Sequence, residues 1–125
     1  MFATRISFSD KSRKDCLFKE EREAMALMNA FAGLNGPFDS VAVMDVDENA
    51  VFAMLPFIDG VPGEVVKLGM PARMRDEYST PDERGLIYVI SGINEATKRV
   101  DAMCVNSGLT IPPTETVGVE MVAAL

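Results

Sequence analysis

Residues 41–55, VAVMDVDENAVFAML, contain two apolar runs separated by a short polar segment. The runs at 41–46 and 50–55 have the length and residue types of strands, and Asp47, Glu48 and Asn49 suit a tight turn. This stretch therefore predicts a β-hairpin. Pro56 is expected to end its second strand, because proline has no N–H to donate to a sheet.

Two helices are predicted, one on each side of this hairpin. Upstream, Ser12 and Asp15 have the spacing of a capping box, and apolar residues recur at near-helical intervals until Gly33 and Gly36 end the helix. Downstream, Asn94 can cap a second helix that Gly108 would end. The apolar positions of the two helices are Leu17, Ala24, Leu27, Met28 and Phe31 in the first and Ala96, Val100, Met103 and Cys104 in the second.

Four further strands are predicted from alternating or short apolar runs, at 2–8, 65–70, 86–90 and 117–121. The order strand–helix–four strands–helix–strand predicts one α+β domain over residues 1–125. Its single, mostly antiparallel sheet would have five to six strands, with two helices packed on one face. This order is similar to a ferredoxin-like plan with an inserted hairpin, a likeness of topology that transfers no function.

The composition argues against most catalytic classes. The chain of 125 residues has no His, which removes the usual neutral-pH acid–base group and the commonest transition-metal ligand. It has no Walker A, Gly-x-Ser-x-Gly or Gly-x-Gly-x-x-Gly motif. Cys16 and Cys104 show no metal-ligand spacing, and both are expected to be buried as small apolar residues. The sequence predicts a non-enzyme without cofactor or metal, with reduced cysteines and a cytoplasmic location, since no signal or membrane segment is recognised.

The sequence Asp45-x-Asp47, which follows an apolar run, is the motif most typical of a catalytic or cation-binding site. It resembles the Mg²⁺-binding strand end of haloacid dehalogenase-type phosphatases, although Glu48 and Asn49 depart from that family's pattern. It also resembles the start of an EF-hand loop, but Ala50 and Pro56 stand where that loop needs Gly and Glu. A Mg²⁺-dependent phosphatase using Asp45 and Asp47 is therefore kept as a lesser alternative.

The charge of the chain, −7 in total, is unevenly distributed. Residues 23–66 hold seven acidic side chains and no Lys or Arg. This block, together with short strands whose edges need partners, predicts a small binding or regulatory protein that acts through protein contacts and self-assembles. Its protein-binding surface would be the acidic turn of Asp45, Asp47 and Glu48. Occluding a basic site with such a surface is a strategy of virus-encoded inhibitors.

Binding of single-stranded nucleic acid is the alternative from another class. Cations that follow a phosphate backbone and rings that stack on bases are the combination such proteins use. The loop 71–85 and the segment after residue 10 both offer it. The residues predicted for this role are Lys11, Arg13, Lys14, Arg73, Arg75, Tyr78 and Arg84.

Overall fold

The computed structural model describes residues 1–125 and contains mostly strands, with one α-helix and two antiparallel sheets. The chain divides into two compact units, residues 1–65 and residues 66–125. The predicted mixture of helix and strands is confirmed, but the single sheet with two helices on one face is wrong. The α-helix has ten residues, and no helix is long and apolar enough to cross a bilayer.

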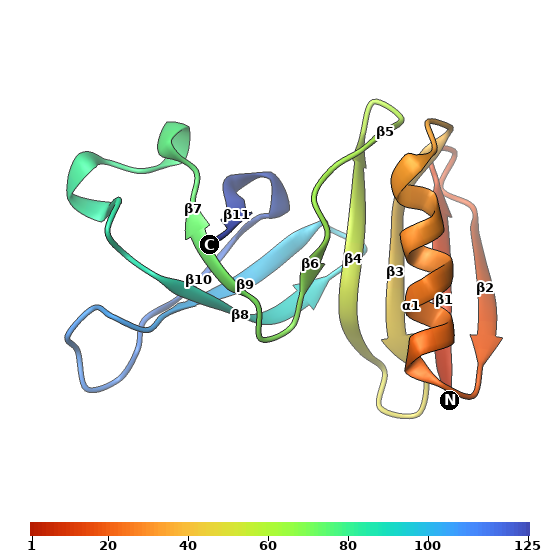
Figure 1. Ribbon diagram of the computed structural model, residues 1–125, viewed down its shortest axis with the longest axis horizontal. Coiled ribbons are helices and arrows are strands. Elements are labelled where there is room, and N and C mark those ends of the chain that lie inside the picture. Colours follow the sequence, from red (N-terminus) through yellow and green to blue (C-terminus); the bar gives the residue numbers. More distant parts are fainter. The chain divides into compact units, whose positions relative to one another are not determined.

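Unit 1, residues 1–65, is an antiparallel sheet with a helix on one face (Figure 1). Its strand order is β2-β1-β3-β4-β5, so β2 lies at an edge. A 3₁₀ turn, Phe31–Gly33, follows the helix. The elements are β1 (Phe2–Phe8), β2 (Arg13–Phe18), α1 (Glu21–Ala30), β3 (Phe38–Asp45), β4 (Ala50–Ile58) and β5 (Val61–Pro62).

The core of unit 1 lies between α1 and the sheet. Ala24 and Met28 are the fully buried residues of the helix, and the Thr4 hydroxyl donates a hydrogen bond of 2.7 Å to the Ala24 carbonyl. Partly buried phenylalanines, including Phe8, Phe31 and Phe38, pack around this core. The buried cluster comprises Ile6, Ala24, Met28, Val41, Val43, Ala53, Leu55 and Phe57.

The hairpin predicted at 41–55 is confirmed as β3 and β4, with residues 46–49 in the turn. The expected stop at Pro56 is wrong: β4 continues to Ile58, and Pro56 pairs with Ser40. The first strand is confirmed as β1.

The first helix begins later than predicted, because Arg13–Phe18 form strand β2. The Asp10 carboxylate accepts bonds from the Ser12 backbone N–H (2.9 Å) and hydroxyl (2.5 Å), and Lys11 has a φ of 76°. These features close a turn between β1 and β2, so Ser12 lies in a hairpin turn and does not cap a helix. The helix starts after Glu20, without a side-chain cap.

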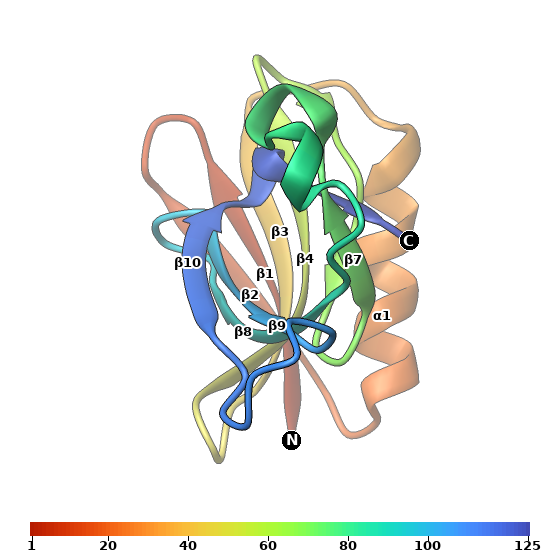
Figure 2. The same ribbon diagram turned by 90° about the vertical axis from the view of Figure 1, so that its left-hand side faces the viewer.

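Unit 2, residues 66–125, has a sheet of strand order β10-β9-β8-β7-β11. In Figure 2, β10 and β7 lie on opposite sides of the β8–β9 hairpin. Single 3₁₀ turns stand at Asp76–Tyr78, Pro81–Glu83 and Val119–Met121. The strands are β6 (Val66–Lys67), β7 (Pro71–Met74), β8 (Tyr88–Asn94), β9 (Arg99–Cys104), β10 (Thr114–Gly118) and β11 (Val122–Ala124). The strand predicted at 86–90 is present in part as the start of β8, whereas only Val66–Lys67 of the strand predicted at 65–70 is extended. Of the strand predicted at 117–121, residues 117–118 end β10, and Val119–Met121 form a 3₁₀ turn instead.

The second predicted helix is wrong, because residues 88–104 form the β8–β9 hairpin. Asn94 accepts bonds from the N–H groups of Ala96 (3.1 Å) and Thr97 (3.2 Å), which closes the turn, and Lys98 has a φ of 53°. Alternate residues of β9 are buried: Val100, Ala102 and Cys104. The opposite face of β9 therefore carries Arg99, Asp101 and Met103, because strand side chains alternate.

Candidate functional site

The acidic turn between β3 and β4 is a local, hydrogen-bonded structure. The Asp45 carboxylate accepts bonds from the N–H groups of Asp47 (2.9 Å) and Glu48 (3.3 Å). Asp47 is 74% exposed and pairs with the Met1 amino group at 2.7 Å. This hydrogen bond raises the pKa of the amino group. Glu48 is exposed. Asp45 therefore shapes the turn, while Asp47 and Glu48 present its charge.

The predicted basic residues of the N-terminal segment lie on the hairpin between β1 and β2. Lys11 is in the turn, and Arg13 and Lys14 begin the edge strand β2; all three are exposed. Because successive strand residues face opposite sides, Arg13 and Lys14 do not share one face of the sheet. They form a charged hairpin tip in unit 1.

The other predicted basic residues lie in unit 2, in the segment from β7 to β8. Two of its arginines share one carboxylate: Asp76 lies 3.7 Å from Arg73 and 4.0 Å from Arg84. Tyr78 is 46% exposed, whereas Arg75 is partly buried. The three arginines and Tyr78 therefore lie in one segment, but the carboxylate of Asp76 offsets part of the positive charge of the arginines.

Both cysteines are free, and Cys104 is buried as predicted, whereas Cys16 lies in β2 and is partly buried. The Cys104 thiol donates to the Asn106 side-chain oxygen at 3.7 Å. Asn106 also joins two backbone groups, accepting from the Ile87 N–H (2.8 Å) and donating to the Gly85 carbonyl (3.0 Å). This amide therefore holds the entry to β8 against the end of β9.

A small cavity of about 110 Å³ lies beside Cys104. Tyr88, Glu83 and Glu115 line it, and Tyr88 is buried. Burial raises the pKa of the Tyr88 phenol, and the nearby negative charges, Glu115 first, raise it further. The phenol is therefore held neutral and can donate a hydrogen bond.

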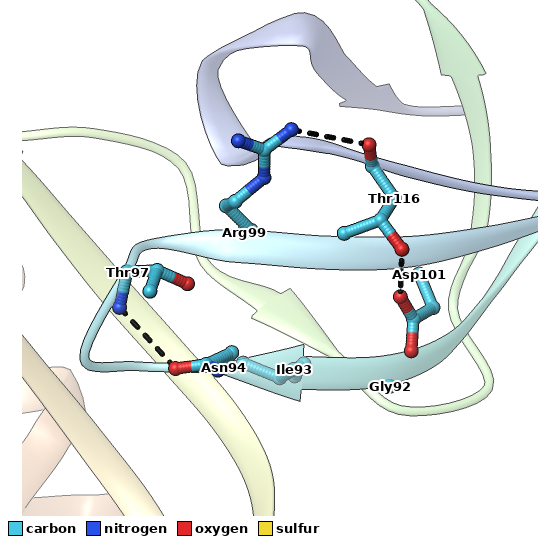
Figure 3. A pocket seen from close by; sticks show the side chains of 7 residues that line it. All are labelled: Gly92, Ile93, Asn94, Thr97, Arg99, Asp101 and Thr116. Carbon is cyan, nitrogen blue, oxygen red and sulfur yellow. Dashed lines mark hydrogen bonds between the residues drawn. The ribbon is translucent and has the colours of Figure 1, made fainter.

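A polar cavity of about 400 Å³ lies on the face of unit 2 opposite its buried side chains (Figure 3). The hairpin β8–β9 and strand β10 supply its lining: Gly92, Ile93, Asn94, Thr97, Arg99, Asp101 and Thr116. In Figure 3, Asn94 and Thr97 lie at one end and Asp101 lies at the other. We call this cavity the polar pocket.

Two hydrogen bonds organise the polar pocket. The Thr116 hydroxyl donates to Asp101 Oδ1 at 2.7 Å, and Arg99 Nη2 donates to the Thr116 carbonyl at 3.3 Å. The other Asp101 oxygen lies over Gly92, where a Cβ would approach it to 2.5 Å. Gly92 therefore leaves the space that the carboxylate occupies.

The sequence analysis did not predict the polar pocket, because Asn94, Thr97, Arg99 and Asp101 fall in the predicted second helix. The signal was present in residues 99–104, RVDAMC, where polar and apolar residues alternate in the first four positions. Such alternation is typical of a strand with one polar face. It would have placed Arg99 and Asp101 side by side.

Comparisons with protein-family models, curated proteins and solved structures find no match to this chain. No group of three or more Asp, Glu or Cys side chains is arranged to hold a metal ion.

Proposed function

We propose that this chain is a small binding or regulatory protein that acts through protein contacts and associates with itself. The observation that carries the proposal is the apolar segment between β9 and β10. Within seven residues, Val105 is 48%, Leu109 65% and Ile111 81% exposed. Grouped apolar side chains in water mark a contact surface more often than single ones do.

The strand next to this segment supports the same proposal. β10 is the edge of its sheet, so one side of its backbone has no strand neighbour. It contains neither Pro nor Lys, the residues that commonly protect an edge, and Glu115 is its one charged residue. A partner strand could therefore add to β10, with the apolar segment covered by the same partner.

A second copy of the chain offers a suitable strand. β2 is the edge of the sheet in unit 1, and it carries Arg13, Lys14 and the 60% exposed Leu17. Its basic end complements Glu115 of β10. Pairing of unlike edges is a heterologous contact, which produces rings or open chains of copies.

Light scattering coupled to size exclusion tests self-association. We expect the wild-type protein to exceed the mass of one chain, and the double variant Leu109→Asp/Ile111→Asp to elute as a single chain. Leu34→Asp is the control, because Leu34 is also exposed but lies outside both proposed edge strands and the apolar segment. A wild-type protein that stays a single chain at every accessible concentration contradicts the proposal.

The acidic turn is proposed as the surface for a basic protein partner. Glu48 is the residue to test, because Asp45 is needed for the turn and Asp47 is paired. Glu48→Lys should weaken binding of a basic protein partner in a pull-down. The variant alone should elute from size exclusion at the same volume as the wild type. Capture that is unaffected by this charge reversal excludes the turn as the contact.

Single-strand nucleic-acid binding is the second candidate, favoured by the exposed ring of Tyr78 in an arginine-containing segment. Asp76→Asn should then strengthen binding of a labelled oligonucleotide, because it frees Arg73 and Arg84, while Tyr78→Ala should weaken it. Phosphate contacts are strongest at low salt, so absence of binding there removes this candidate.

A further inference from the structure

The polar pocket holds one positive and one negative side chain that do not pair with each other. Arg99 donates to the Thr116 carbonyl, whereas Asp101 accepts from the Thr116 hydroxyl. We propose that this pocket binds a small zwitterion of the size of a free α-amino acid. Its ammonium group would bind Asp101, and its carboxylate would bind Arg99.

The acidic end of the pocket has an acceptor to offer. Thr116 occupies Asp101 Oδ1, and Oδ2 lies over Gly92, which has no side chain to cover it. A carboxylate oxygen is an acceptor without a proton of its own, so it suits an ammonium donor. The hydrogen bond from Thr116 and the close fit over Gly92 fix the position of this carboxylate.

The basic part of the pocket has donors to offer. A guanidinium has five N–H donors, and Arg99 uses Nη2 for Thr116. The Asn94 oxygen is occupied by the turn, and its NH₂ group is a further donor on a residue that lines the pocket. The Thr97 hydroxyl lines the same end of the pocket. A ligand carboxylate could therefore accept from several groups at once.

The charges favour a zwitterion over a simple ion. An anion at Arg99 would be opposed by Asp101, and a cation at Asp101 would be opposed by Arg99. The two residues are two positions apart on β9, or about 6–7 Å along the strand, which leaves room for a ligand that touches both. The volume of about 400 Å³ also lies within the range of small-molecule sites.

The primary experiment is a two-dimensional ¹⁵N NMR titration of the whole chain with each standard L-α-amino acid in turn. We expect at least one to shift the amide signals of residues 92–101 and 116. Its N-acetyl and methyl-ester forms, which lack the ammonium and the carboxylate respectively, should bind about tenfold to a hundredfold more weakly, because each loses one charge-assisted contact. If no amino acid shifts these signals, or if the blocked forms bind equally well, the proposal is wrong.

Variants of the pocket provide the second test. Asp101→Asn and Arg99→Gln should each weaken binding about tenfold or more while retaining the wild-type spectrum elsewhere. Arg99 is exposed, so its replacement should leave the fold intact. Arg84→Gln, an exposed arginine of the same unit outside the pocket, should bind as the wild type does. Unchanged affinity in Arg99→Gln overturns the assignment even if Asp101→Asn fails to fold.

Discussion

The two units of this chain are built from different side chains. All seven phenylalanines lie within residues 1–65, where a helix covers one face of the sheet, and both tyrosines lie within residues 66–125, where the sheet has no α-helix. Large rings fill the space between a helix and a sheet, whereas the buried residues of unit 2 are mainly Val and Ala. The unit without a helix keeps a polar face, and the polar pocket lies there. The comparison suggests that aromatic packing stabilises one unit while the other displays polar groups.

The largest expected effects come from matched cavity variants, one in each unit. Leu55 and Ile90 are both fully buried, so Leu55→Ala and Ile90→Ala should each lower the free energy of unfolding by about 2–5 kcal/mol. Chemical denaturation measures this loss. If the chain is one domain, as its sequence predicts, both variants shift a single transition. Two separate transitions, each moved by only one variant, would contradict that prediction.

A glycine of unit 1 should give a smaller effect. Gly60 has a φ of 77°, and a Cβ there would lie 2.8 Å from the Gly36 carbonyl oxygen. Gly60→Ala should therefore cost about 1–3 kcal/mol, through both backbone strain and this contact. Gly69 of unit 2 has a φ of 80° but open space around it, so Gly69→Ala should show the cost of the backbone alone. Equal losses in the two variants would mean that the contact with Gly36 is unimportant.

The smallest expected effect concerns the ion pair between β1 and β2. Asp15 lies opposite Arg5 and accepts two bonds from it, at 2.8 and 3.0 Å, which lowers the pKa of Asp15 below its ordinary value of 3.8. The stabilisation is therefore complete above pH about 4 and is lost as the pH falls through the lowered pKa. Asp15→Asn should cost about 1 kcal/mol or less at neutral pH, because the pair is partly exposed.

Urea denaturation at pH about 7 and at a pH below the lowered pKa checks this dependence. The difference between the wild type and Asp15→Asn should disappear in acid. A difference that persists there would mean that the variant acts through packing rather than charge.

The part of the fold that the sequence predicted depends on short-range apolar patterns. The strand at 2–8 and the hairpin at 41–55 have clear apolar runs and a polar turn, and both are present. The later part of the first predicted helix is present as α1, with Ala24 and Met28 buried. These elements repeat their apolar residues with the period of the structure that they form.

The two helix errors, at Ser12 and at Asn94, have one physical cause in common. An Asn, Asp or Ser side chain that accepts from, or donates to, nearby backbone groups can cap a helix or close a turn. Asn94 does accept two backbone N–H bonds, as expected of a helix cap, but they close a hairpin. Whether such a residue caps a helix or closes a turn depends on strand pairing across the sheet. Here that pairing joins Asn94 to Arg99 and Ile93 to Val100. Single-residue patterns do not contain that information.

The candidate sites were predictable to different degrees. The acidic turn was found from its position between two apolar runs, although the structural role of the Asp45 carboxylate was not. The pairing of Asp76 with two arginines depends on a segment folded back on itself and could not be read from spacing. The polar pocket combines residues from three strands, so it required the correct strand assignment first.

The amide of Asn106 links the chemical ageing of the protein to its fold. Its NH₂ group faces the Gly85 carbonyl, and its oxygen receives the Ile87 N–H. Deamidation would replace that NH₂ group with a carboxylate oxygen, so two acceptors would then oppose each other. Deamidation of this one side chain would therefore weaken the contact that holds the start of β8. Aged protein would then be less stable than newly made protein of the same sequence.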